Sequence, residues 1–129
     1  MSHFTVYDCN VSNVDYIKKA LEEMGLGHKT NTKMTDWYGQ TRQAEIAVVQ
    51  NGKVLPLGWL RNEKEELQLQ ADWFDCRGIR QADFTQQVQQ LHAKYQVLDT
   101  CQEAGWSVDI NDINMNSEGE IEILATSYR

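Results

Sequence analysis

The cysteines are the first residues whose side chains suggest chemistry. Cys76 stands beside Arg77 and Arg80, and nearby positive charge lowers the pKa of a thiol and makes it nucleophilic. A nucleophile also needs a base partner, and the sequence indicates none. Cys9 and Cys101 lie far from it along the chain, and an odd count without a Cys-x-x-Cys pair argues against a disulfide framework. We therefore predict reduced, mostly buried thiols and no catalytic residue.

The histidines and an acidic run near the C-terminus are the candidate metal ligands. His3, His28 and His92 are scattered, and no two have the helical spacing of four that would place both imidazoles on one ion. A zinc site made of Cys76 and His92 is the strongest pairing, but a residue on the flank of a helix explains His92 better. Residues 109–122 resemble an EF-hand loop in their alternating oxygen side chains, yet lack its glycine and its final glutamate. We predict no metal and no cofactor.

The formal charge of −7 is unevenly placed along the 129 residues. Residues 1–62 carry 7 basic and 6 acidic side chains, whereas residues 63–129 carry 5 and 13. An acidic half repels nucleic-acid phosphates and anionic lipid, so a basic protein is a more suitable partner than either. Nucleic-acid binding would need five cations on one face: Lys29, Lys33, Arg42, Arg77 and Arg80. The sequence shows no spanning apolar stretch and no signal peptide, which predicts a cytoplasmic protein without membrane contact.

Aromatic side chains are dense between residues 37 and 74: Trp37, Tyr38, Trp59, Trp73 and Phe74. Such a group serves either a core or a recognition face, and core packing is the usual explanation. The segment around Tyr38, Gln40 and Arg42 is the exception, because it stands beside Gly39 between two elements, where loops present functional groups.

The elements that must position these residues begin with a strand over residues 3–10, which are rich in aromatic and β-branched types. Asn13 and Asp15 then supply helix-starting groups. A helix follows, because apolar residues recur at steps of three or four until Gly25, a typical helix-ending residue. Residues 27–34 are polar and lysine-rich, so they form either a loop or an exposed edge strand.

Three strands in a meander follow. The first covers residues 44–49 and connects to residues 54–60 through Asn51-Gly52, the dipeptide typical of a type I′ turn because both positions need positive φ. Pro56 has no N–H to donate, so the second strand lies at a sheet edge or carries a bulge. In the third strand, residues 67–71, apolar and polar residues alternate as in a half-buried strand.

A long amphipathic helix is the strongest single signal. Asp83 and Gln86 have the pattern of a capping box at its start, and Gly105 follows its end. One stripe of residues should pack on a sheet: Phe84, Val88, Leu91, Tyr95, Leu98 and Cys101. The chain then closes with a hairpin of residues 106–110 and 121–125 around a polar turn at 116–119.

This order of elements predicts an α+β fold, with two helices packed on one face of an antiparallel sheet. We expect a ferredoxin-like arrangement with an inserted hairpin, in a single domain over residues 1–129. If the strand around Pro56 lies at an edge, a second copy of the chain could pair with it and form a homo-oligomer.

Four segments carry a resemblance to a known family: Met1-Ser2-His3-Phe4, Tyr38-Gly39-Gln40-Thr41-Arg42-Gln43-Ala44-Glu45, Gln70-Ala71-Asp72-Trp73-Phe74, and the run from Phe84 through Tyr95 to Gly105-Trp106. In this order, over nearly the whole chain, they resemble the ycf-thirty-five-like family of cyanobacteria and plastids, which also has relatives in other bacteria and in phages. The C-terminal turn Glu118-Gly119 is similar as well. The chain departs from the family in its last residues, 125–129, and in its acidic C-terminal half.

The resemblance implies a small protein of unknown function from a photosynthetic bacterium, a plastid or an infecting phage. It places the protein in the cytoplasm of a bacterial or phage-infected cell, or in the plastid stroma for plastid relatives. It also implies an AAA-type ATPase as a partner, because relatives are encoded near such ATPases. It supplies no catalytic residues.

Two hypotheses of function follow from the sequence. In the first, the chain is a non-enzymatic interaction or accessory module that binds another protein through residues 37–42 or through the sheet face opposite the helices. In the second, it is a small enzyme or ligand-binding protein with a pocket between sheet and helices. The candidate binding residues are His3, Trp37, Tyr38, Gln40, Arg42 and Asp72.

Overall fold

A computed structural model of the chain describes residues 4–107, 113–115, 121–123 and 126–127, and it describes side-chain burial for residues 4–105. The elements, in chain order, are β1 (Thr5–Tyr7), α1 (Val14–Glu23), β2 (Gly27–Thr35), β3 (Thr41–Gln50), β4 (Lys53–Arg61), β5 (Leu67–Ala71), the 3-10 turn η1 (Trp73–Asp75), α2 (Gln81–Glu103), β6 (Trp106–Ser107), β7 (Ile113–Met115), β8 (Ile121–Ile123) and β9 (Thr126–Ser127).

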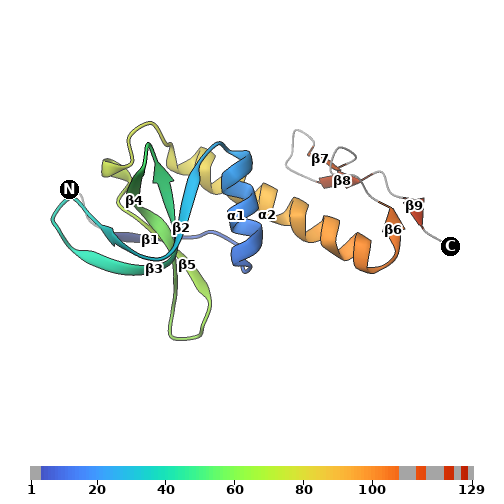
Figure 1. The fold of residues 1–129 in the computed structure, drawn as a ribbon, viewed down its shortest axis with the longest axis horizontal. Helices are drawn as coiled ribbons and strands as arrows, with labels where there is room; N and C mark the ends of the chain where they lie inside the picture. The colour runs from blue at the N-terminus through green and yellow to red at the C-terminus, as the bar shows by residue number, and fades with distance from the viewer. Residues whose placement is uncertain (1–3, 108–112, 116–120, 124–125, 128–129) are drawn as a thin grey trace.

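The main sheet is antiparallel and has five strands in the order β1-β5-β4-β3-β2. One core contains Ile17 and Leu21 of α1, Phe84 and Val88 of α2, and the side chains of one face of the sheet, so both helices pack on that face. The predicted α+β fold is therefore confirmed. Figure 1 shows the sheet at one end of the molecule and α1 lying across α2 beside it.

The C-terminal strands lie outside the main sheet. β7 pairs with β8, and β6 pairs with β9, in two separate two-stranded sheets. Antiparallel pairing near the C-terminus is thus present among the described residues, but residues 121–123 pair with 113–115 and not with 106–110 as predicted. The predicted turn at 116–119 lies outside the described residues. The ferredoxin-like arrangement is not confirmed, because none of these four described strands joins β1–β5.

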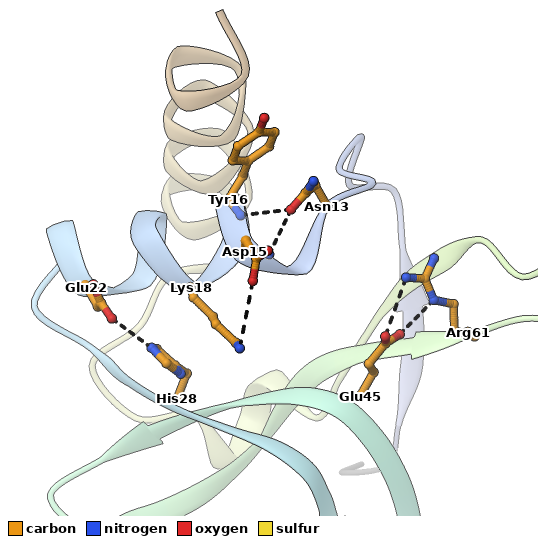
Figure 2. Close-up of polar contacts among 8 residues, drawn as sticks. All are labelled: Asn13, Asp15, Tyr16, Lys18, Glu22, His28, Glu45 and Arg61. Carbon is orange, nitrogen blue, oxygen red and sulfur yellow. Dashed lines mark hydrogen bonds and ion pairs between the residues drawn. The ribbon is translucent and has the colours of Figure 1, made fainter. Parts of the chain in front are cut away.

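Helix α1 begins and ends as the sequence indicates. The Oδ1 atom of Asn13 accepts hydrogen bonds from the main-chain N–H groups of Asp15 (2.8 Å) and Tyr16 (3.2 Å), which closes the helix N-terminus (Figure 2). At the other end Gly25 has a φ of +77°, and the N–H of Leu26 donates to the carbonyl of Leu21 at 2.9 Å. This is the hydrogen-bond pattern of a glycine-terminated helix.

The two edges of the main sheet are β1 and β2. Residues 27–34, for which the sequence predicts either a loop or an exposed edge strand, therefore form an edge strand. Lys29 and Lys33 are exposed on it, and charged side chains of this kind discourage pairing with other chains.

The β3–β4 hairpin has the predicted turn and the predicted bulge. Asn51 and Gly52 both have positive φ, 53° and 76°, which confirms the type I′ geometry. Further along, Ala47 pairs with Gly58 but Val49 pairs with Val54, so three residues of β4 stand opposite a single residue of β3.

Pro56 lies in the middle of that bulge, where a missing N–H breaks no ladder hydrogen bond. Its alternative placement at a sheet edge is wrong, because β4 runs between β3 and β5. In the described sheet the edge strands are therefore β1 and β2, and a homo-oligomer formed through a strand edge stays a prediction.

Helix α2 begins at Gln81, two residues before the predicted capping box, and its N-cap Arg80 makes no side-chain capping hydrogen bond. The capping-box prediction is wrong; Asp83 instead lies in the first turn, where an acidic group suits the helix dipole. Of the predicted stripe, Phe84 and Val88 are fully buried, whereas the residues from 91 to 101 are only half-buried. The reason is that α2 continues past the sheet toward β6 (Figure 1).

No helix in the described part of the chain has both the length and the apolar character needed to cross a bilayer.

His92 connects the two helices. Its side chain is 3% exposed, and its Nε2 atom accepts hydrogen bonds from the main-chain N–H groups of Ser12 (3.2 Å) and Asn13 (3.1 Å) at the start of α1. The ring also meets Tyr16 edge to face, with centroids 5.3 Å apart. The interpretation of His92 as a helix-flank residue is wrong; it is a buried acceptor that must stay neutral. Burial lowers its pKa accordingly.

Candidate functional site

Among residues 4–105, for which the structure describes burial, three large aromatic side chains are exposed. Trp37 is 59% exposed, Tyr38 63% and Phe74 70%. Trp37 and Phe74 meet edge to face, with ring centroids 6.4 Å apart and planes at 78°. We refer to Trp37, Tyr38 and Phe74 as the aromatic surface. Residues of this kind are the usual anchors of protein interfaces.

The loop between β2 and β3 is held in shape by Asp36. The carboxylate Oδ1 accepts the N–H of Gln40 at 2.8 Å, and the main chains of the same two residues join through Asp36 N–H to Gln40 carbonyl at 2.9 Å. Gly39 donates its N–H to the Asp36 carbonyl at 3.1 Å and has a φ of +83°, a conformation that favours glycine. The loop that carries Trp37 and Tyr38 is therefore a closed, hydrogen-bonded turn.

Asp72 joins this loop to the segment after β5. Its Oδ2 atom accepts the N–H of Trp37 at 3.0 Å, and its own N–H donates to the carbonyl of Pro56 at 2.8 Å. Asp72 is only 2% exposed. The sequence proposed Asp72 as a binding residue; the structure places it beneath the surface, where it fixes Trp37 and the η1 turn that carries Phe74.

The remaining candidate residues lie at or near the same loop. Gln40 is exposed, and its main chain helps to close the turn. Arg42, exposed at the start of β3, lies over the ring of Phe4 at 5.7 Å and donates to the Thr41 carbonyl at 3.2 Å. His3 lies outside the described residues. The structure thus brings Trp37, Gln40 and Asp72 into one hydrogen-bonded unit.

In the described part of the chain, the second carboxylate oxygen of Asp36 lacks a hydrogen-bond partner, as do the buried indole nitrogens of Trp59 and Trp73. Asp36 is 4% exposed, and its Oδ2 atom is buried without a hydrogen-bond partner among the residues that the structure describes. A buried polar atom without a partner is costly, and in native structures such an atom calls for an explanation.

The other aromatic residues of the dense region build the core, as the usual explanation has it. Trp59 is fully buried and stacks on Phe84 at 6.0 Å between ring centroids. Trp73 packs edge to face on Phe84 at 5.6 Å and on Tyr7 at 5.7 Å. The division between core and surface therefore runs between the adjacent residues Trp73 and Phe74.

Cys76 is not the reactive thiol that its neighbours in the sequence suggest. Burial, with the nearby charges of Asp72 and Asp75, raises its pKa to about 12. Its Sγ atom lies 3.8 Å from the Pro56 carbonyl in the interior. Burial also raises the pKa of Cys9, to about 11. Neither thiol is a nucleophile at neutral pH, and the idea that nearby arginines activate Cys76 is wrong.

Two hollows in the described part of the molecule lie away from the aromatic surface. One of about 710 Å³ lies between the end of α1 and the start of α2, with Ile79, Arg80 and Gln87 among its lining residues. Another, of about 490 Å³, lies between β1 and α2. Neither is lined by Tyr38, Arg42 or Asp72, the residues expected in a pocket between sheet and helices. Within the described residues, no group of three His, Cys, Asp or Glu side chains is placed to hold a metal ion.

Sequence reasoning missed Phe74 and Asp36 as parts of this site. A signal for Phe74 was available, because if the strand of residues 67–71 continued through Trp73, the side chain of Phe74 would point to the opposite face. No local signal marks Asp36, since its burial and its bond to Gln40 depend on the closed turn.

A family model matches residues 20–124 of the chain, and its description is "Protein of unknown function (DUF1257)". No curated protein and no solved structure matches the chain. The expectation of a family without an assigned function is confirmed by this match.

Proposed function

Because the chain belongs to the DUF1257 family of proteins of unknown function, whose description assigns no activity, we propose a function from the exposed side chains: a non-enzymatic interaction module that binds another protein through the aromatic surface. The observation that carries the proposal is the exposure of Trp37, Tyr38 and Phe74 on two segments that Asp72 fixes to each other. Exposed aromatic groups of this size, gathered on one surface, mark interaction sites in folded domains.

The rigidity of the loops supports the proposal. Binding is weakened by the conformational entropy that flexible groups lose at an interface. Here the loop is closed by three hydrogen bonds involving Asp36, and Trp37 is tethered to Asp72 by its main chain. The rings are thus presented on an ordered backbone, which lowers the entropic penalty of docking.

The finer parts of the proposal come from the resemblance. They are the ycf-thirty-five-like assignment, an origin in a photosynthetic bacterium, plastid or infecting phage, a cytoplasmic or stromal location and an AAA-type ATPase as partner. The single-domain organisation over residues 1–129 is also part of the proposal, and it rests on the length of the chain and the order of its elements.

The test compares capture of partners from host lysate by three tagged proteins: the wild type, a Trp37→Ala/Phe74→Ala variant and a Val6→Ala variant. Val6 is 53% exposed on β1, so it controls for the loss of an exposed apolar side chain elsewhere. A stoichiometric partner retained by wild type and Val6→Ala, but reduced at least about tenfold with the double variant, is the expected result. Equal capture by all three, with melting temperatures unchanged, would refute the proposal.

A further inference from the structure

The charges beneath and beside the aromatic surface are mainly negative. In residues 35–42 and 72–77 the acidic side chains are Asp36, Asp72 and Asp75, and the basic ones are Arg42 and Arg77. Asp36 and Asp72 are at least 96% buried, whereas both arginines are exposed. Solvent screens exposed charges far more than buried ones, so the buried carboxylate of Asp36 contributes more to the potential near Trp37 than the exposed arginines do.

Asp36 contributes a charge that is only half satisfied. Its Oδ1 atom accepts the N–H of Gln40, but Oδ2 has no partner within the described structure. A neutral Asn could hold the same turn through the same oxygen. The turn therefore does not explain why a charged group is buried directly before Trp37, whereas a cation that docks on the surface would.

We infer that the aromatic surface receives an arginine side chain from the partner protein, which rests on the proposed function above. A guanidinium group lies flat against aromatic rings and is attracted by their faces, and the field of Asp36 and Asp72 adds to that attraction. The exposed pair Trp37 and Phe74 offers rings at 78° to each other, so a planar cation stacked on the face of one ring can direct its N–H groups toward the face of the other.

Other occupants fit these observations less well. A purely apolar segment would use the rings but would gain nothing from the buried carboxylates. An acidic segment would be repelled by them and by the overall charge of −7. A lysine would also be attracted by the buried carboxylates, but its compact, strongly hydrated ammonium group stacks less well on a ring than a guanidinium does.

The test uses the ¹⁵N-labelled full-length protein and the blocked peptide acetyl-Gly-Arg-Gly-Arg-Gly-amide. Matched peptides carry citrulline or lysine in place of arginine; citrulline keeps the planar shape but has no charge. Titration is followed through the indole N–H signal of Trp37, which is assigned from a Trp37→Phe variant. We expect the arginine peptide to shift this signal in saturable fashion, the lysine peptide to bind more weakly and the citrulline peptide to leave the signal in place.

Two variants separate charge from shape. Asp36→Asn keeps the acceptor for the Gln40 N–H and removes the charge, and it should weaken arginine-peptide binding about three- to tenfold. Glu63→Gln removes the same charge from the exposed turn at the other end of β5 and should change binding less than about 1.5-fold. Equal effects of the two variants, or equal binding of the arginine and citrulline peptides, would overturn the inference.

The outcomes also separate this inference from the proposed function. If the protein partner depends on Trp37 and Phe74 but its capture is unchanged by Asp36→Asn, the interaction surface stands and its arginine specificity fails. If neither the partner nor the arginine peptide depends on Trp37 and Phe74, both ideas fail together.

Discussion

Replacing His92 with leucine is the sharpest test of how the two helices are joined. The imidazole Nε2 atom accepts the main-chain N–H groups of Ser12 and Asn13 at 3.2 and 3.1 Å. Leucine fills a similar volume but accepts neither bond. The variant therefore leaves two partly buried donors without a partner while it keeps the apolar contacts of the site.

The magnitude follows from those two donors. A buried donor that loses its acceptor costs about 1–3 kcal/mol, and partial burial places each of these near the lower end. We expect His92→Leu to lower the free energy of unfolding by about 2–4 kcal/mol at pH 7.5, a large part of the stability of a small domain. The control is His28→Gln, which removes the exposed pair between His28 and Glu22, 3.1 Å apart, and should cost less than about 1 kcal/mol. Figure 2 shows this pair at the opposite end of α1 from the Asn13 cap.

The contribution of His92 to the free energy of unfolding also depends on pH. Burial lowers its pKa in the folded protein below the ordinary value of 6.5, so the unfolded chain takes up the proton more readily. Its contribution is complete above pH 6.5 and is lost as the pH falls through the folded-state pKa. The difference in free energy of unfolding between wild type and His92→Leu should therefore be smaller at pH 5 than at pH 7.5. The titration of all other groups affects both proteins alike and cancels in this difference.

Urea unfolding monitored by circular dichroism at both pH values measures these differences, with an unchanged m-value as the check that the variant unfolds in the same way. The reasoning is refuted if His92→Leu costs no more than His28→Gln, or if the difference from wild type is the same at pH 7.5 and pH 5.

Three further predictions concern packing, thiol reactivity and the contact between helices. Gly58→Ala should destabilise by about 2–3 kcal/mol in urea unfolding, since the new Cβ would lie 2.5 Å from a main-chain oxygen of β3; a neutral result would contradict the tight bulge. With iodoacetamide at pH 8, peptide mapping should find the partly exposed Cys101 modified well before Cys76, whose pKa is about 12; equal rates would show that Cys76 is accessible as thiolate. Tyr95→Phe removes a 3.0 Å hydrogen bond to Glu23 and should lower the free energy of unfolding by about 0.5–1.5 kcal/mol, measured by thermal or urea unfolding. An unchanged free energy of unfolding would show that this bond is absent in solution.

Much of the fold could be predicted because its signals are local. The Asn51-Gly52 turn and the glycine that ends α1 require positive φ, which few residues adopt easily, so their types determine the backbone. The alternation from Leu67 to Ala71 likewise places every second side chain in the core, as observed. Each of these features depends on a few neighbouring residues.

The predictions that failed depended on distant parts of the chain. Pro56 is equally compatible with an edge and with a bulge, and only the pairing of β4 on both sides decides between them. The apolar stripe of α2 cannot reveal where the sheet beneath it ends. His92 looks like a surface residue until α1, about eighty positions earlier, brings its N-terminus to the ring.

The same limit applies to the candidate site. Residues 37–42 could be identified because aromatic residues beside Gly39 are typical of an exposed turn. The hydrogen bond from the N–H of Trp37 to Asp72 joins residues 35 positions apart, so no local pattern predicts it. Because of this bond, Asp72 positions Trp37, whereas the sequence suggested that Asp72 itself contacts a ligand. Phe74 and Asp36 enter the site through that same fold-dependent connection.

The pairing of β1 with β5 has a consequence for the nascent chain. Val6 pairs with Gln70, so β1 leaves the ribosome long before its only partner strand in the main sheet has been made. At translation rates of roughly 5–20 residues per second, the interval is about 3–13 seconds. During that time β2, β3 and β4 can form hairpins from neighbouring residues, whereas β1 waits without a template. Completion of the main sheet is therefore expected to wait for the synthesis of β5, and chaperones that hold extended nascent segments would act on β1 until then.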